Sequence, residues 1–302
     1  MKEGRPSLTA ELACAVRAVE SMKPPHKRVC YDPYAGDFIG LWLRLIAKSR
    51  VLTRLILWEA ERIAPGVPGE VIGRTRYIDD CLKRRIEDGI QQLVVLGAGY
   101  DSRAYRFEEL KGRVKSFELD YPSTQELKLK RVRRVFGASP DGVVYVPIDF
   151  NSDSLERMLF DAGYDRTLKT FFIWEGVTYY ITDQAVNETL EFVVKHSGEG
   201  SSIFFDYAFR SVIEGHGEVW QVNRTLKAYE LVAAPITSEH FVFGVEEGTI
   251  EEFLEKRGLH LIENVTGEFF ESSYFAGVKQ TRQVSRLCGF AHAGIGPKRD
   301  TR

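Results

Sequence analysis

The chain has 302 residues, of which 44% are hydrophobic and 28% are charged, and its formal net charge is −2. This composition is sufficient for a large buried core and excludes a disordered chain. The nearly balanced charge argues against a nucleic-acid-binding or membrane-surface protein, so we expect neither partner.

One short segment carries an excess of positive charge. Its basic residues are Lys128, Lys130, Arg131, Arg133 and Arg134. We interpret them as the solvated face of a helix. The four cysteines have no CxxC spacing, which favours reduced thiols and a cytoplasmic protein over a disulfide framework.

The first ninety residues are predicted to be helical. Apolar residues at helical spacing predict helices over 7–22, capped by Thr9, and over 70–88, with Gly89 as the cap. The segment 38–58 between them is strongly hydrophobic but contains four cations, which are too costly for a membrane span. We therefore predict two core-packed amphipathic helices there. The apolar face of the first comprises Phe38, Leu41, Trp42, Leu45 and Ile46, and the second spans 50–63.

Strands alternate with helices from residue 92 onward, which predicts an α/β fold with a parallel, doubly wound sheet. The expected strands are 93–96, 114–119, 143–146, 170–174 and 202–206, and the helices between them are 122–135, 152–162 and 182–196. After an irregular stretch with a helix near 218–231, a helix over 249–257 and strands over 259–265 and 284–291 complete the sheet.

These elements are expected to form a single domain. Its parts are a helical cover over 1–90, a cofactor-binding core over 91–207, a lid insertion over 208–247 after the fifth strand, and the remainder of the sheet over 248–302. The cover and the lid are placed over the ligand site because neither segment contributes to the alternating pattern.

The turn Gly97-Ala98-Gly99 follows the first buried strand and precedes a helix start. Glycine allows a sharp turn and leaves no side chain between the backbone and a ligand. In an open α/β sheet, the crevice at such a turn binds nucleotide-like ligands.

Acidic residues follow the next three strands. Asp120, Asp149 and Glu175 stand at these strand ends, which meet at one edge of a parallel sheet. Three carboxylates suit a ligand with hydroxyls, an amino group and positive charge, such as S-adenosylmethionine. Each acid taken alone would equally fit a turn or helix cap.

A dinucleotide is the competing ligand. Its phosphate-binding fingerprint requires a third glycine, but Ser102 occupies that position, and Asp101 would lie close to a pyrophosphate. The residues therefore favour a cofactor without phosphates.

The same residues belong to motifs that resemble the leucine carboxyl methyltransferase family, and in particular its bacterial branch of S-adenosylmethionine-dependent O-methyltransferases. The stretch 97–106 is similar to the family signature GAGxDTRxYR. Further family patterns match, in order, at 9–20, at 32–35 (DPYA), at 74–80 (RTRxxDD), at 118–122 and at 175–182 (EGVxxYLT). The resemblance implies a Rossmann-like, class I methyltransferase sheet.

The resemblance also implies a set of cofactor-binding residues. These are Arg74, Gly97, Ala98, Gly99, Asp120, Tyr121, Asp149, Phe150 and Glu175. Arg74 is expected to bind the methionine carboxylate and Glu175 the α-ammonium group, which agrees with their charges. Asp120 is expected at the ribose, and Asp149 with Phe150 at the adenine. The residue pattern alone indicates a surface helix arginine for Arg74, and only the resemblance gives it this role.

Methyl transfer mainly requires that nucleophile, methyl and sulfur are aligned. A carboxylate nucleophile needs no general base, whereas an alcohol or phenol does. Polar residues expected near the methyl group are Tyr180, Tyr207, Asp101, Arg103 and Arg106. Tyr180 and Arg103 are the catalytic candidates, because both could orient a substrate carboxylate. The alternatives are a core tyrosine, and an arginine paired structurally with Asp101 or Asp120.

His216 and His240 are weaker candidates for a base on the lid. No cluster of His, Cys and carboxylate residues has the spacing of a metal site, so we predict no metal. The leading hypothesis is an enzyme that methylates a carboxylate or hydroxyl of a small metabolite and releases S-adenosylhomocysteine. A NAD(P)-dependent oxidoreductase and a non-catalytic relative that keeps the cofactor pocket remain as alternatives.

Overall fold

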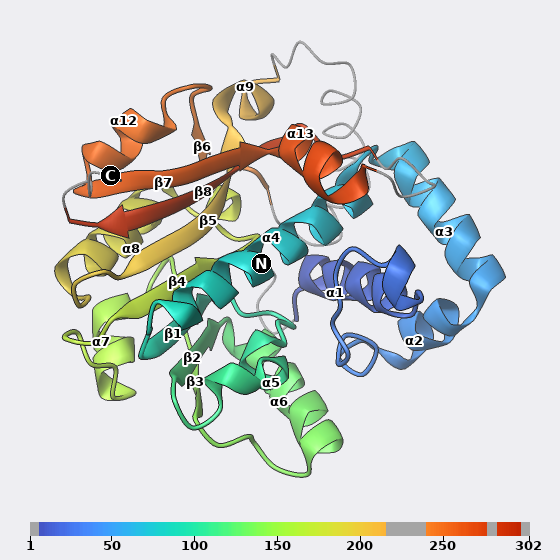
Figure 1. Cartoon of the computed structure of the whole chain (residues 1–302), viewed down its shortest axis with the longest axis horizontal. Coiled ribbons are helices and arrows are strands. Elements are labelled where there is room, and N and C mark those ends of the chain that lie inside the picture. The colour runs from blue at the N-terminus through green and yellow to red at the C-terminus, as the bar shows by residue number, and fades with distance from the viewer. Residues whose placement is uncertain (1–5, 216–239, 277–282, 297–302) are drawn as a thin grey trace.

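The computed structural model describes residues 6–215, 240–276 and 283–296, and its centre is one mixed sheet (Figure 1). The strands are β1 (Gln92–Leu96), β2 (Lys115–Asp120), β3 (Val143–Pro147), β4 (Thr170–Trp174), β5 (Ser202–Phe209), β6 (Gly244–Val245), β7 (Leu259–Thr266) and β8 (Cys288–Ile295). Their order is β3-β2-β1-β4-β5-β8-β7, and β6 pairs with β5. The strands β1 to β5 are parallel, whereas β8 runs antiparallel between β5 and β7.

Helices cover both faces of this sheet. They are α1 (Leu8–Ser21), α2 (Leu41–Lys48), α3 (Arg50–Ile63), α4 (Val67–Glu87), α5 (Arg103–Arg106), α6 (Pro122–Phe136), α7 (Leu155–Asp161), α8 (Asp183–Lys195), α9 (Arg210–Ile213), α12 (Ile250–Glu255) and α13 (Gly267–Phe270). Short 3-10 turns lie at Pro25–Lys27, Glu108–Leu110 and Thr178–Tyr180, and a π-helical turn spans Glu271–Phe275. The doubly wound α/β architecture predicted from the sequence is confirmed, with parallel pairing over β1 to β5, whereas the antiparallel pairing of β8 was not predicted.

The central strands are buried on both faces, which explains their continuous apolar runs. In β1, Leu93 and Val95 pack with α4 and α13, and Val94 and Leu96 pack with α7, α8 and α12. Alternate side chains therefore enter two separate cores. This sandwich holds the strand ends, and the loops that follow them, in fixed positions.

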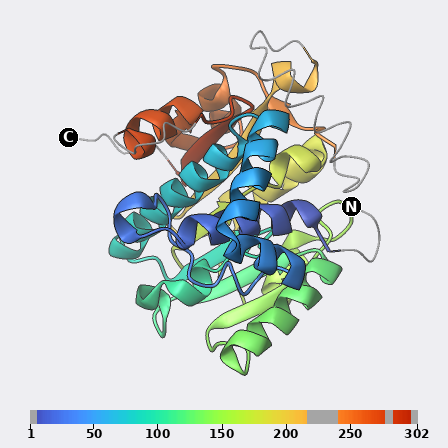
Figure 2. The same ribbon diagram turned by 90° about the vertical axis from the view of Figure 1, so that its right-hand side faces the viewer.

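The first three helices lie beside the sheet, and α4 crosses one of its faces (Figure 1). Figure 2 shows the blue helices of the N-terminal segment in front of the rest of the chain. Helix α1 begins at Ser7, whose side chain accepts a hydrogen bond from the Ala10 amide at 3.1 Å. The predicted cap Thr9 is therefore wrong by two residues.

The two helices predicted from residue 38 onward are present as α2 and α3, and the second spans 50–63 as predicted, but the expected packing of the first in the core is wrong. Phe38 is buried but precedes α2, whereas Leu41, Trp42 and Leu45 on α2 are exposed, Trp42 to 80%. Helices α2 and α3 pack against each other, and they contact α1 and α4 respectively. The apolar periodicity predicted the amphipathic helices, but it did not predict which of their faces pack against other elements.

The basic cluster is not one solvated face. Lys128 is only 1% exposed, and its ammonium lies 2.8 Å from Glu118 on β2. Arg131 is buried as well and pairs with Glu11 of α1 at 2.5 Å. Two members of the cluster therefore fasten α6 to the sheet and to α1, while Lys130 remains on the surface.

Two differences concern the C-terminal third of the chain. The last strand is Cys288–Ile295 rather than 284–291, because its pairing with β5 and β7 brings glycines and His292 into the sheet. Strand β5 continues to Phe209, so the region interpreted as a lid begins later. The helix expected near 218–231 lies outside the described residues. In the part of the chain that the structure covers, no helix combines the length and apolarity required to span a bilayer.

Candidate active site

A cavity of about 1020 Å³ lies at the carboxyl ends of the parallel strands. Loops after β1, β2, β3 and β4 line one part of it, and α1 to α4 line the other. The cavity brings together every residue predicted to bind the cofactor: Arg74, Gly97, Ala98, Gly99, Asp120, Tyr121, Asp149, Phe150 and Glu175. Tyr180 also lines the cavity, whereas Arg103 is not among the lining residues.

The turn after β1 requires glycine for two reasons. Gly97 has a φ of 69°, in the left-handed region that other residues rarely adopt. A Cβ atom at this position would lie 2.2 Å from Cγ2 of Val177 in the loop after β4. The loops after β1 and β4 are therefore in direct contact, and the backbone of Gly97 faces the cavity without a side chain.

Asp120 at the end of β2 faces the same turn. Its carboxylate accepts hydrogen bonds from the amides of Gly99 and of Tyr121, the latter at 2.6 Å. These two bonds fix the orientation of the side chain at the turn, as the structural alternative for a strand-end acid allowed.

Asp149 and Phe150 form the edge of the cavity beyond β3. The Asp149 carboxylate accepts the Asn151 amide at 3.0 Å. The Phe150 ring lies beside Trp174, with 6.5 Å between ring centroids. An acceptor group and an apolar ring therefore stand next to each other, as recognition of a flat heterocycle with an amino group requires.

A buried ion-pair network links α4 to the end of β4 and to Asp206 within β5. The Arg74 guanidinium donates to Glu175 at 2.9 Å and to Asp206 at 2.6 Å. Asp206 also accepts the Gly176 amide at 2.8 Å. Burial raises the pKa of Glu175, but the neighbouring Arg103 and Arg74 outweigh burial and leave that pKa below its ordinary value. Glu175 is therefore a carboxylate at neutral pH.

Arg103 lies behind this network. It is 3% exposed and donates to Asp79 at 2.8 Å, to Glu175 at 2.9 Å and to the Asp101 carboxylate. Three carboxylates occupy its donors, so the predicted role in orienting a substrate is not supported. The structural alternative, pairing with Asp101, is the one observed. Arg106 likewise pairs with Asp79, at 2.5 Å.

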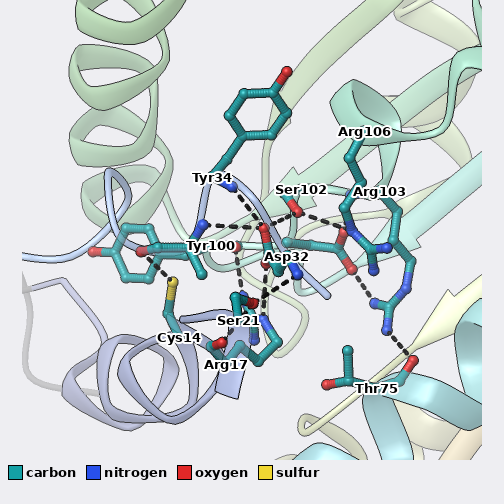
Figure 3. Close-up of polar contacts among 12 residues, drawn as sticks. Cys14, Arg17, Ser21, Asp32, Tyr34, Thr75, Tyr100, Ser102, Arg103 and Arg106 are labelled. Carbon is teal, nitrogen blue, oxygen red and sulfur yellow. Dashed lines mark hydrogen bonds and ion pairs between the residues drawn. The ribbon is translucent and has the colours of Figure 1, made fainter. Parts of the chain in front are cut away.

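A second network holds the N-terminal segment against the β1 turn (Figure 3). Asp32 of the DPYA motif accepts hydrogen bonds from Arg17 at 3.1 Å and from Ser102 at 2.7 Å, as well as from the amides of Tyr34 and Ala35. Arg17 also donates to the carbonyl of Tyr100 at 2.7 Å. Two sequence motifs about seventy residues apart therefore meet at one buried carboxylate.

Sequence reasoning gave no role to Arg17, Asp32 or Asp206. Arg17 and Asp32 lie within motifs that match the family, and Asp206 is the last residue of a predicted strand. The sequence therefore indicated these positions but not the residues that they contact. Tyr207 lies away from the cavity and donates to Asn264 at 3.2 Å. His240 lines the cavity, and His216 lies outside the described residues. Among the residues that the structure places, no His, Cys, Asp or Glu cluster is arranged to hold a metal ion.

Comparisons with known proteins agree on one family. The family model described as "Leucine carboxyl methyltransferase" matches residues 10–194. The Bacillus subtilis protein named "Putative S-adenosyl-L-methionine-dependent methyltransferase YktD" is 29% identical over 240 residues, which cover 80% of this chain and 76% of that protein. A Streptomyces coelicolor protein with the same description, SCO7813, is 32% identical over 68% of this chain and 70% of its own length.

Solved structures agree on the fold. A DUF574 family protein from Streptomyces avermitilis superposes with a TM-score of 0.58 at 14% identity, over 97% of this chain and 99% of the other. A "putative methyltransferase" from Thermobifida fusca gives 0.53 at 13% identity, over 98% and 97% of the two chains. Since the family model spans more than half of the chain and includes every motif that lines the cavity up to Tyr180, this protein belongs to the leucine carboxyl methyltransferase family.

Proposed function

We propose that this S-adenosylmethionine-dependent methyltransferase transfers the methyl group to an oxygen atom of a small-molecule acceptor, either a carboxylate or a hydroxyl. One observation carries the proposal. Arg74 and Glu175, two opposite charges 2.9 Å apart, share a cavity with Asp120 and Asp149. S-adenosylmethionine is an amino acid joined to a nucleoside. Its carboxylate complements Arg74, its ammonium group complements Glu175, and its ribose and adenine complement Asp120 and Asp149.

Each side chain has a defined task in this proposal. Arg74 binds the methionine carboxylate by a charge-assisted hydrogen bond while it keeps its bonds to Glu175 and Asp206, and Glu175 binds the α-ammonium group. The turn at 97–99, which lines the cavity, lies beneath the methionine. Asp120, beside Tyr121, accepts the ribose hydroxyls, and Asp149 and Phe150 hold the adenine.

The cofactor, when bound, supplies an electrophilic methyl group on a sulfonium. The new O–CH₃ bond forms as the S–CH₃ bond breaks, and the electron pair of the broken bond remains on sulfur. A carboxylate acceptor loses no proton, so the chain needs only to position it and to exclude water. Tyr180 lines the cavity directly after the β4 loop, where its hydroxyl can orient the acceptor. Arg103 supports Glu175 from behind.

Binding of S-adenosylhomocysteine, measured by calorimetry, tests the proposal. The wild type should bind, and Asp120→Asn should weaken binding about tenfold or more, because a charged acceptor of hydrogen bonds is lost. Asp161→Asn is the matched control, since Asp161 is exposed on α7 away from the cavity. Unchanged binding in Asp120→Asn, or no binding by the wild type, would refute the assignment. A panel of carboxylic acids, alcohols and phenols, assayed for S-adenosylhomocysteine formation, then tests oxygen methylation.

A further inference from the structure

The cavity has a second part that the cofactor residues do not account for. Beyond the strand-end loops it continues between the four N-terminal helices. The aliphatic residues that line this part are Leu12, Val16 and Val19 on α1, Leu43, Ile46 and Ala47 on α2, Ile56, Leu57, Ala60 and Ile63 on α3, and Val67 and Val71 on α4. We call this part the helical chamber.

The α2 and α3 walls of the helical chamber offer almost nothing to a polar ligand, whereas Glu70, beside Val71 on α4, also lines the cavity. The described lining on α2 and α3 contains one hydroxyl, that of Thr53. This hydroxyl donates to the carbonyl of Ile46 at 2.9 Å and also lies 3.3 Å from that of Ala47. It therefore closes the α2–α3 hairpin. A sugar, nucleotide or peptide placed there would lose its hydrogen bonds to water without replacement, which is unfavourable.

The size of the cavity also points to a second occupant. Binding sites for single small ligands have volumes of roughly 300–1000 Å³, and this cavity of about 1020 Å³ lies at the upper end. Except for Arg74 on α4, the residues assigned to the cofactor lie in the strand-end part. The helical chamber therefore offers space for the acceptor, and Tyr180 lines the same cavity.

We propose that the acceptor is an aliphatic chain with an oxygen nucleophile at one end, and that the chain lies in the helical chamber. The inference rests on the proposed function, since it assigns the substrate class of the same site. The terminal oxygen forms the O–CH₃ bond as the S–CH₃ bond breaks. A terminal carboxylate releases no proton, whereas a terminal alcohol would pass its proton to a base, for which His240, a histidine that lines the cavity, is the candidate.

Chain length is the first test. Straight-chain alkanoates from butanoate to tetradecanoate are titrated by calorimetry into the full-length protein with S-adenosylhomocysteine present. Burial of each additional methylene in an apolar cavity should strengthen binding about fourfold until the chamber is full. The 1-alkanols of matched length distinguish a carboxylate head from a hydroxyl head. Benzoate and gluconate serve as aromatic and polar comparisons.

A variant that fills the chamber provides the second test. In Ala60→Phe, dodecanoate should bind at least about tenfold more weakly, whereas butanoate and S-adenosylhomocysteine should bind as to the wild type. Ala138→Phe introduces the same ring at an exposed site beyond α6 and should change nothing. If Ala60→Phe does not fold, Leu57→Ala serves instead, because enlarging the chamber should shift the preferred chain to a longer one.

The outcomes separate the two proposals. Binding of S-adenosylhomocysteine without any chain-length dependence, or tighter binding of gluconate or benzoate than of the alkanoates, would overturn the aliphatic assignment and leave the proposed function intact. Unchanged dodecanoate binding in a folded Ala60→Phe would place the chain elsewhere and overturn it as well. Loss of S-adenosylhomocysteine binding by the wild type would instead overturn the proposed function.

Discussion

Arg74 on α4 and Asp206 within β5 form a buried ion pair, with 2.6 Å between Nη1 and Oδ2. They are separated by 132 positions in the chain. The same guanidinium binds Glu175, so one side chain joins the helical segment to β5 and to the residue that follows β4. This bridge places the guanidinium in the cavity, with Glu175 beside it.

The bridge predicts that lysine cannot replace Arg74. Lysine keeps the charge but lacks the planar fork that reaches two carboxylates at once. We expect Arg74→Lys to reduce affinity for S-adenosylhomocysteine about 10- to 100-fold, measured by calorimetry. Arg76→Lys, two residues along the same helix and on its exposed side, should bind normally. Equal affinity in the two variants would contradict the role given to Arg74.

Gly97 should tolerate no side chain. Gly97→Ala combines a positive φ with a contact of 2.2 Å to Val177, and we expect the free energy of unfolding to fall by more than about 2 kcal/mol. Gly89→Ala has a similar φ of 77° but open space around its Cβ, so its cost should be only about 1 kcal/mol. Urea denaturation measures both. The double variant Gly97→Ala/Val177→Ala should recover part of the loss, and no recovery would show that the clash is not the cause.

The buried pair of Lys128 and Glu118 should be sensitive to removal of one partner. Both side chains are 1% exposed, and the Lys128 ammonium also lies 3.4 Å from the carbonyl of Ala98 in the β1 turn. Lys128→Met leaves a buried carboxylate without its cation, which should cost about 3–5 kcal/mol in the free energy of unfolding. The double variant Lys128→Met/Glu118→Gln should lose less. Lys130→Met removes an exposed ion pair on the same helix and should leave the melting temperature unchanged.

The pH dependence of stability should report the charge of Glu70. Burial raises its pKa to about 7 from an ordinary value of 4.5, although Arg74 opposes the shift. A carboxyl whose pKa is raised by folding contributes its full stability at pH values below its pKa in the unfolded chain. This contribution is lost as the pH rises through its pKa in the folded chain. The free energy of unfolding should therefore fall between about pH 4.5 and 7, by up to about 3 kcal/mol.

The variant Glu70→Gln isolates that contribution. Its stability relative to the wild type should increase as the pH rises from about 4.5 to 8, as measured by denaturation at each pH. Asp206, whose buried carboxyl has a pKa raised to about 6, contributes with the same sign and remains in the variant. Parallel pH profiles for variant and wild type would show that Glu70 does not titrate in this range.

The strands and the strand-end acids were predictable because they depend on local pattern. The run at β4, Thr170–Trp174, is apolar, short and bounded by polar residues, and its limits were predicted without error. Asp120, Asp149 and Glu175 follow such runs directly. Because parallel strands end at one edge of a sheet, their meeting in one cavity required no knowledge of contacts distant in the sequence.

Buried charge was not predictable, because it depends on partners far along the chain. Lys128 resembles its exposed neighbour Lys130 in the sequence, and only Glu118 on the adjacent strand makes its burial possible. Arg103 had two possible roles until Asp79, Asp101 and Glu175 were placed around it. The exposure of α2 was not predictable for the same reason, because the sequence does not show which face of a helix packs against distant parts of the chain.

The two parts of the cavity come from separate stretches of the chain. Strand-end loops within 95–181 form the part assigned to the methyl donor, whereas α1 to α3 form most of the helical chamber. Changes in the chamber side chains of α1 to α3 can alter the acceptor and leave the donor loops intact, provided that Arg17 and Asp32, which hold the β1 turn, are kept. Helix α4 is the exception, because Arg74 serves the donor and Val71 lines the chamber. Diversification of acceptors among related enzymes should therefore be widest before α4 and narrowest within it.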